Sequence, residues 1–184
     1  MRVHSFAPIV DSRSRVLILG SMPGRASLRA GEYYAHPRNL FWPFMERLLG
    51  VRSAERYERR VEELLARGVG LWDVVSACER RSSLDADIVS GSIVANDLLG
   101  LLEAHRSLRA VCLNGAKAAL EFRRHVLPSL PAARRIALYE LPSTSPANAS
   151  IPLARKLEAW SVVSREARAA RRSRGVRLGE ASLG

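Results

Sequence analysis

The chain contains a short segment bounded by two glycines, Gly20-Ser21-Met22-Pro23-Gly24, directly after an apolar run. Glycines let the backbone approach a ligand closely and expose amide donors to it. No Gly-Lys-Ser/Thr follows the segment, and the three-glycine fingerprint of dinucleotide sites is absent. Taken alone, the segment is equally compatible with a ligand site and with a structural turn.

Aromatic and hydrogen-bonding side chains are gathered in a second segment, Tyr33-Tyr34-Ala35-His36-Pro37-Arg38-Asn39. Tyrosine rings stack on planar heterocycles, while imidazole and amide groups hydrogen-bond the edges of such rings. This combination indicates a site for a base. The structural alternative is that Tyr33 or Tyr34 belongs to the core and that Asn39 caps the helix that follows.

Two prolines and three hydroxyl side chains dominate a third segment, Pro142-Ser143-Thr144-Ser145-Pro146-Ala147-Asn148. Hydroxyl groups and backbone amides are the usual positioning contacts to phosphate. A stiff polar loop of this kind favours phosphate binding, and an ordinary capped loop is the alternative.

Single polar side chains at the ends of other apolar runs are further candidates. Asn114 ends an apolar run, where a buried amide needs a partner, so it either reads the edge of a base or ties down a neighbouring loop. Asp73 is expected to make a structural hydrogen bond. Ser82-Ser83-Leu84-Asp85 resembles a helix-capping run, which leaves chemistry at Asp85 as the lesser expectation. No metal site is predicted, because no cluster of histidine and cysteine has ligand spacing.

Four apolar runs would position these segments as buried strands. The first and third are almost uninterrupted, which is typical of strands covered on both faces of a parallel sheet. The runs are Arg15–Gly20, Gly70–Ser76, Arg109–Gly115 and Arg135–Leu141. Each ends in or directly before a polar segment, and open parallel sheets bind ligands beyond the carboxyl ends of their strands. We therefore predict that the polar segments meet at one edge of the sheet.

Amphipathic segments of helical periodicity separate the apolar runs. They cover residues 41–49, closed by Gly50; residues 57–65, with Ser53 as N-cap and Gly68 as the stop; and residues 98–102, 116–126 and 152–170. Alternating strands and helices form parallel βαβ units. The prediction is an α/β protein, a three-layer α/β/α sandwich with a four-stranded parallel sheet. One domain over residues 1–172 would carry a basic, flexible tail over residues 173–184.

The charge balance points to a polyanionic partner. The 184 residues include 29 Lys and Arg against 18 Asp and Glu, a formal net charge of +11. Nucleic acid is the first expectation and an anionic membrane surface the second. Two cysteines exclude a disulfide framework, and the first residues resemble no signal peptide, so we expect a cytoplasmic protein.

Four segments, in this order, resemble the signatures of the uracil-DNA glycosylase superfamily, most closely its hypoxanthine-DNA (deoxyinosine) glycosylase branch. They are GSMPGRASLRAGEYYAHPRNLFW, GVGLWDVVSACERRSSLDADI, VCLNGAKAALEF and LPSTSPANA, and they span about residues 15 to 150. The resemblance implies an α/β/α fold without metal or cofactor. It also implies hydrolysis of the N-glycosidic bond of a deaminated base, flipped out of double-stranded DNA during base excision repair. We expect a monomer, because nothing in the sequence demands a dimer, and no membrane partner.

The resemblance further assigns roles to single residues. Several branches of the superfamily carry an Asp or Asn in the first loop to act on the water, where this chain has Met22; in the deoxyinosine branch Asn39 takes over as catalytic residue. Tyr34 would stack on the base, the backbone of residues 20–24 would line the pocket, and His36 would add a protonation switch. Asn114 would read the base edge. Ser143, Thr144 and Ser145 would hold DNA, while Pro146, Ala147 and Asn148 would enter the space that the flipped base leaves.

The strand-cleaving and non-enzymatic alternatives are also set by particular residues. A glycosylase that also cuts the strand needs an amine nucleophile. Lys117 and Lys156 are the lysines of the chain, and neither is an obvious nucleophile, so a monofunctional enzyme that leaves an abasic site is predicted. The alternatives are a uracil or mismatch-specific uracil/thymine glycosylase of the same fold, an inactive DNA-binding module, for which Met22 argues, and a hydrolase of free nucleotides.

Overall fold

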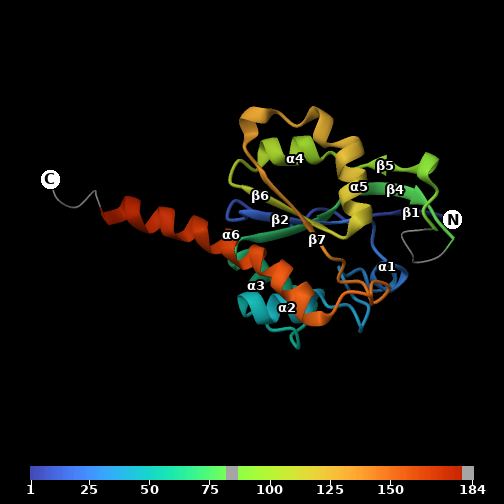
Figure 1. The fold of residues 1–184 in the computed structure, drawn as a ribbon, viewed down its shortest axis with the longest axis horizontal. Coiled ribbons are helices and arrows are strands. Elements are labelled where there is room, and N and C mark those ends of the chain that lie inside the picture. Colours follow the sequence, from blue (N-terminus) through green and yellow to red (C-terminus); the bar gives the residue numbers. More distant parts are fainter. Residues whose placement is uncertain (82–86, 180–184) are drawn as a thin grey trace.

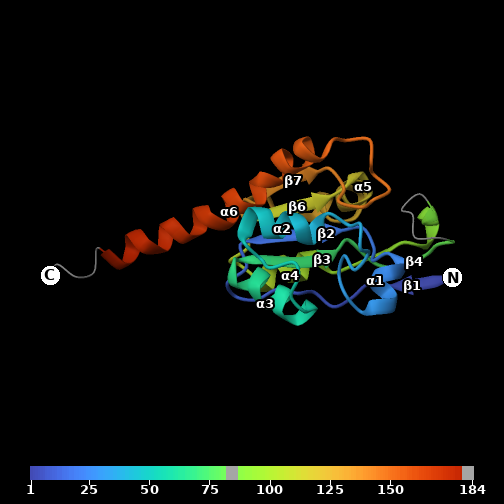
Figure 2. The same ribbon diagram turned by 90° about the horizontal axis from the view of Figure 1, so that it is seen from below.

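The computed structural model describes residues 1–81 and 87–179, with side chains of the last helix described as far as residue 169. A four-stranded parallel sheet runs through its centre in the order β3-β2-β6-β7 (Figures 1 and 2). Its strands are β2 (Val16–Gly20), β3 (Val69–Asp73), β6 (Ala110–Asn114) and β7 (Ala137–Leu141). Every residue of β2, β3 and β6 is buried, whereas β7 alternates between more and less exposed residues, as an edge strand does.

Helices cover both faces of this sheet, which confirms the predicted three layers (Figure 1). Val16 and Ile18 of β2 belong to an apolar core shared with α2 (Phe41–Leu49), α3 (Tyr57–Ala66) and α6 (Leu153–Gly179). Leu17 and Leu19 point to the opposite face, where they pack with α4 (Leu98–Ala104) and α5 (Ala116–His125). Successive residues of one strand thus serve two different cores, because side chains alternate across a strand.

A second, three-stranded antiparallel sheet was not predicted. It has the order β1-β4-β5 and consists of β1 (Arg2–His4), β4 (Val75–Glu79) and β5 (Val94–Ala95). The predicted strand Gly70–Ser76 is wrong in extent, because β3 ends at Asp73 and the chain enters the second sheet at Val75. Apolar residues continue through this change of sheet, so the sequence pattern hides it.

Some helix ends also differ from the prediction. Gly50 closes α2 with a positive φ of 71°, as expected, but α3 begins after Arg56 and not after Ser53, whose hydroxyl hydrogen-bonds Glu46 at 2.6 Å. The short helices α1 (Arg25–Ala30), η2 (Ser90–Ser92), η3 (Leu127–Ser129) and η4 (Ala132–Arg134) were not predicted.

The last helix, α6, continues to Gly179 instead of ending near residue 170, and Figure 1 shows its second half projecting from the body of the protein. The flexible tail over residues 173–184 stays a prediction. Among the described residues, no helix is long and apolar enough to cross a membrane.

Candidate active site

The carboxyl ends of the parallel strands bring the predicted polar segments together. Gly20 pairs with Asp73 across β2 and β3, and Asn114 pairs with Leu141 across β6 and β7. A backbone hydrogen bond of 3.0 Å from Leu40 to the carbonyl of Thr144 joins the segment that contains Asn39 to the loop after β7. The predicted meeting of these segments at one sheet edge is confirmed.

The backbone at Gly20 has no room for a side chain. A Cβ atom there would lie 2.5 Å from Oδ1 of Asp73 and 3.5 Å from the hydroxyl of Tyr34. The following segment is tied down on its other side, because the guanidinium of the buried Arg80 donates to the carbonyl of Pro23. Gly20 therefore keeps a close approach of backbone, carboxylate and phenol that any larger residue would break.

The side chain of Met22 is buried away from the polar segments at the strand ends. It is 7% exposed and packs in a small apolar cluster with Val3, Val75, Cys78 and Ile88, between the second sheet and α1. A carboxylate or amide at this position would enter an apolar cluster. This packing gives a structural reason for a methionine in the first loop.

The two adjacent tyrosines have different roles. Tyr33 is 2% exposed, and its carbonyl accepts a hydrogen bond of 3.0 Å from the indole of Trp42, so its assignment to the core is confirmed. Burial raises the pKa of Tyr33, and the charge and hydrogen bond of Asp73 raise it further. Asp73 thus makes the structural hydrogen bond expected of it.

Tyr34 is half-buried and has a left-handed backbone with a φ of 58°, which is uncommon for residues other than glycine. Such strained residues cluster at functional sites. Its ring stacks on Phe41 with centroids 4.0 Å apart and planes 18° apart. One face of the Tyr34 ring therefore lies against Phe41, and stacking of a base on Tyr34 stays a prediction.

Hydrogen bonds to the backbone fix the orientation of Asn39 at the start of α2. Its side-chain Oδ1 accepts the backbone N–H of Phe41 at 2.9 Å, and its backbone N–H donates to the carbonyl of His36 at 2.8 Å. The structural alternative for Asn39 is thus present in the fold. The carbonyl retains a second lone pair and the NH₂ group its donors, so this contact leaves capacity for a ligand.

His36 takes part in the same turn. Its Nδ1 accepts the backbone amide of Arg38 at 3.1 Å, so the neutral ring carries its proton on Nε2. Protonation of Nδ1 would remove this hydrogen bond. The residue is half-buried, and its role as a protonation switch stays a prediction.

Asn114 and Thr144 form a reciprocal pair. Asn114 Nδ2 donates to Oγ1 of Thr144 at 2.9 Å, and Oδ1 of Asn114 accepts the Thr144 amide at 3.0 Å. Asn114 therefore ties down the loop, as one of its two interpretations predicted. Thr144 is 1% exposed and acts as an anchor of the loop; the contact of Asn114 with a base and that of Thr144 with DNA stay predictions.

Further hydrogen bonds shape the loop between Pro142 and Asn148. The hydroxyl of Ser143 accepts the amide of Ser145 at 3.2 Å, and the hydroxyl of Ser145 accepts the amide of Ala147 at 3.3 Å. Ala147 is exposed, whereas its neighbours Pro146 and Asn148 are half-buried. Ala147 is thus the accessible residue among these three, and entry of the segment into DNA stays a prediction.

Sequence reasoning missed the two side chains that hold this loop to α6. Trp160 donates its indole N–H to the carbonyl of Pro142 at 2.9 Å, and Lys156 donates to the carbonyls of Ser143 and Asn148. Both look like ordinary helix residues in the sequence. A lysine in a chain whose basic residues are almost all arginine was the one available signal.

The segment Ser82-Ser83-Leu84-Asp85 lies outside the described residues.

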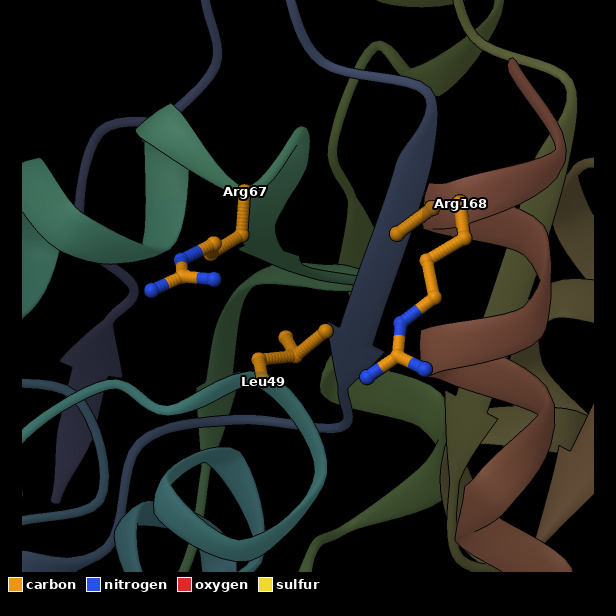
Figure 3. Close-up of a pocket in the computed structure, with 4 residues that line it drawn as sticks. Leu49, Arg67 and Arg168 are labelled. Carbon is orange, nitrogen blue, oxygen red and sulfur yellow. The ribbon is translucent and has the colours of Figure 1, made fainter. Parts of the chain in front are cut away.

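A small hollow with two arginines lies away from this site. Figure 3 shows Arg67 and Arg168 on either side of Leu49. The cavity that these residues line has a volume of about 40 Å³. Arg67 directly follows α3 and precedes β3, which places the cavity at the amino ends of the parallel strands.

Among the described residues, no group of three or more histidine, cysteine or carboxylate side chains is placed to hold a metal ion.

Known proteins are similar to this chain over most of its length. Residues 7–163 match the family model of the Uracil DNA glycosylase superfamily. Two relatives named Hypoxanthine DNA glycosylase, from Methanosarcina acetivorans and Methanosarcina barkeri, are each 36% identical to the chain, over 141 and 118 residues. These matches cover 72% and 64% of this chain, and 88% and 73% of the relatives.

A solved structure agrees with the fold. The solution NMR structure of a candidate uracil DNA glycosylase from Methanosarcina acetivorans is 32% identical and superposes with a TM-score of 0.75, covering 91% of this chain and 99% of its own. The residues matched by the family model include all of the strand-end segments described above. The chain therefore belongs to the uracil DNA glycosylase superfamily.

Proposed function

We propose that this protein is a monofunctional DNA glycosylase that releases hypoxanthine from double-stranded DNA and leaves an abasic site. The observation that carries the proposal is the hydrogen bond between Leu40 and Thr144, which joins the segment of Tyr34 and Asn39 to the loop after β7. One segment suits a base and the other suits the DNA backbone. The relatives named Hypoxanthine DNA glycosylase support hypoxanthine as the base.

In the proposed reaction, a water oxygen bonds to C1′ of the deoxyribose while the bond from C1′ to N9 of the base breaks. The electron pair of that bond goes to the base, and the proton lost by the water balances the charge of the leaving base. Asparagine has no useful basicity near neutral pH, so Asn39 positions the water or stabilises the base and does not remove the proton. The rate then comes from positioning and from stabilising the developing charge.

The glycosidic bond lies inside the duplex, so the nucleotide must first leave the stack. Extrusion costs a few kcal/mol and is easiest for a mispaired base such as hypoxanthine opposite thymine. Tyr34 would stack on the base through the ring face opposite Phe41, and Ala147 with its neighbours would fill the gap. Ser143 and Ser145 would contact phosphates through the hydroxyl groups that also shape the loop.

The test is single-turnover base release from matched duplexes that contain hypoxanthine, uracil or xanthine at one position. We expect fastest release of hypoxanthine, with strand breaks that appear only after alkali. Faster release of uracil would assign the protein to uracil repair. Salt-sensitive binding without release of any base would favour the inactive module, and hydrolysis of free deoxyinosine alone would favour a nucleotide hydrolase.

A further inference from the structure

Lys156 is a buried cation at the base of the loop that follows β7. The residue is 2% exposed and lies in the first turns of α6. Its Nζ donates to the carbonyl of Ser143 at 2.8 Å and to the carbonyl of Asn148. Lysine is almost never fully buried without a partner, and here the partners are backbone carbonyls rather than a carboxylate.

The two carbonyls belong to opposite ends of the loop, so one ammonium group joins both ends. Trp160 and Asn114 hold the first half, at Pro142 and Thr144. In the described part of the chain, the other hydrogen bonds of residues 146–148 stay within residues 145–150. The hydrogen bond from Lys156 to Asn148 is therefore what ties the second half of the loop to α6.

We propose that Lys156 is a positioning residue whose ammonium holds Pro146, Ala147 and Asn148 in the conformation that enters the DNA when the nucleotide leaves the stack. This inference rests on the proposed function. Hydrogen bonds from a charged donor are shorter and stronger than neutral ones. A segment that is already ordered loses less conformational entropy when it inserts, so its insertion is more favourable.

Burial lowers the pKa of Lys156 from its ordinary value, because the charged form loses contact with water. The two carbonyl partners of Nζ favour the ammonium form in return. The ammonium donors are directed at two carbonyls, so Lys156 is occupied in holding the loop. It is not placed here as a nucleophile.

The inference predicts a difference between duplex and single-stranded DNA. Extrusion from a duplex leaves a gap that Pro146, Ala147 and Asn148 fill, whereas a single strand has no opposing stack to open. Loss of Lys156 should therefore slow base release from the duplex far more than from the single strand. A residue needed only for folding would affect both substrates alike.

The experiment compares Lys156→Met with Arg155→Met in single-turnover release of hypoxanthine from a duplex and from the same strand unpaired. Arg155 is the neighbouring residue on α6, and its exposed side chain lies 3.7 Å from Glu158, so its loss removes the same charge without touching the loop. We expect Lys156→Met to reduce the duplex rate about tenfold or more and the single-strand rate by less than about threefold. Arg155→Met should change both by less than about threefold.

Equal losses on both substrates, or no loss on the duplex, would overturn the role of Lys156 while leaving the proposed function intact. A wild-type protein that releases hypoxanthine from neither substrate would instead overturn the proposed function. Should Lys156→Met fail to fold, hydrogen exchange in the wild type carries the test. The amides of Ser145, Ala147 and Asn148 must then be protected before DNA is added, and exchange at the rate of an unstructured peptide would contradict the inference.

Discussion

At the scale of single residues, the site depends on close approaches that only particular side chains allow. Gly20 lets the Asp73 carboxylate and the Tyr34 phenol lie against the end of β2. Tyr34 keeps a left-handed backbone and a ring stacked on Phe41, and Asn39 is oriented by the Phe41 amide. Three segments distant in sequence thus determine how a base would be held.

Gly20→Ala tests the close approach directly. The added methyl group would lie 2.5 Å from Asp73 Oδ1, so the strand end or the carboxylate must move. Overpacking of this kind costs about 1–3 kcal/mol of unfolding free energy, and we expect hypoxanthine release to fall about tenfold or more. The matched control is Gly91→Ala, where nothing lies within 4 Å of the new methyl group. Denaturant unfolding and single-turnover release check both variants, and equal behaviour of the two would refute the packing argument.

At the scale of elements, the loop after β7 is held by β6, by α6 and by the residue that precedes α2. Asn114 extends from the end of β6, and Trp160 and Lys156 extend from α6. The backbone bond from Leu40 adds the start of α2. These contacts together give an ordered loop in which Ala147 is exposed.

The two interpretations of Asn114 can be separated by changing one partner at a time. Thr144→Val removes the hydroxyl that accepts from Asn114 Nδ2 but leaves the amide of Asn114 free to contact a base. If Asn114 also reads the base edge, Asn114→Ala should reduce single-turnover release at least about tenfold more than Thr144→Val. Losses of similar size in the two variants would limit Asn114 to holding the loop.

The strands and helices differ in how well their sequences predicted them. Runs such as Arg15–Gly20 were recognisable because both faces of the parallel strands are buried. The second sheet was missed because β1 and β5 have three and two residues, and β4 continues an apolar run from β3. The change of sheet depends on distant hydrogen bonds, such as that from Val75 to the carbonyl of Ser21, which leave no local pattern.

The same distinction applies to the site. The meeting of the polar segments followed from the rule for parallel sheets, whereas their mutual contacts did not. Lys156 contacts carbonyl groups 8 and 13 residues before it in the sequence, and backbone carbonyls have no sequence signature. Burial of the Met22 side chain likewise depends on Val3 and Val75, from a sheet that was not predicted.

At the scale of the whole molecule, the net charge and the projecting last helix are the features relevant to the proposed DNA binding. The net charge is +11, and α6 projects from the body of the protein (Figure 1). Trp160 and Val163 of α6 are buried in the core, so the first part of the helix belongs to the domain. A domain over residues 1–172 with a separate basic end remains our proposal for the organisation of the chain.

Binding should weaken steeply with salt, because each neutralised phosphate releases counterions and contributes a slope of about −0.9 to a plot of log K against log salt. We expect the half-saturating protein concentration to rise with salt, while release at saturation stays constant.

A chain truncated after Arg172 should remain folded and active, with a smaller slope because Arg174 and Arg177 are absent. Titrations of duplex DNA between low and physiological salt measure both slopes. Binding that does not change with salt, or a truncated chain that does not fold, would contradict this description.

The most direct test of the central claim is single-turnover release of hypoxanthine from a duplex by the wild type and by Asn39→Ala at saturating protein. The matched control is Ser53→Ala, which removes an exposed hydroxyl bonded to Glu46 in the turn between α2 and α3. We expect a loss of about a hundredfold or more in Asn39→Ala, with unchanged DNA binding and a rate near that of the wild type in the control. Release by Asn39→Ala within a few-fold of the wild type would show that the chemistry lies elsewhere.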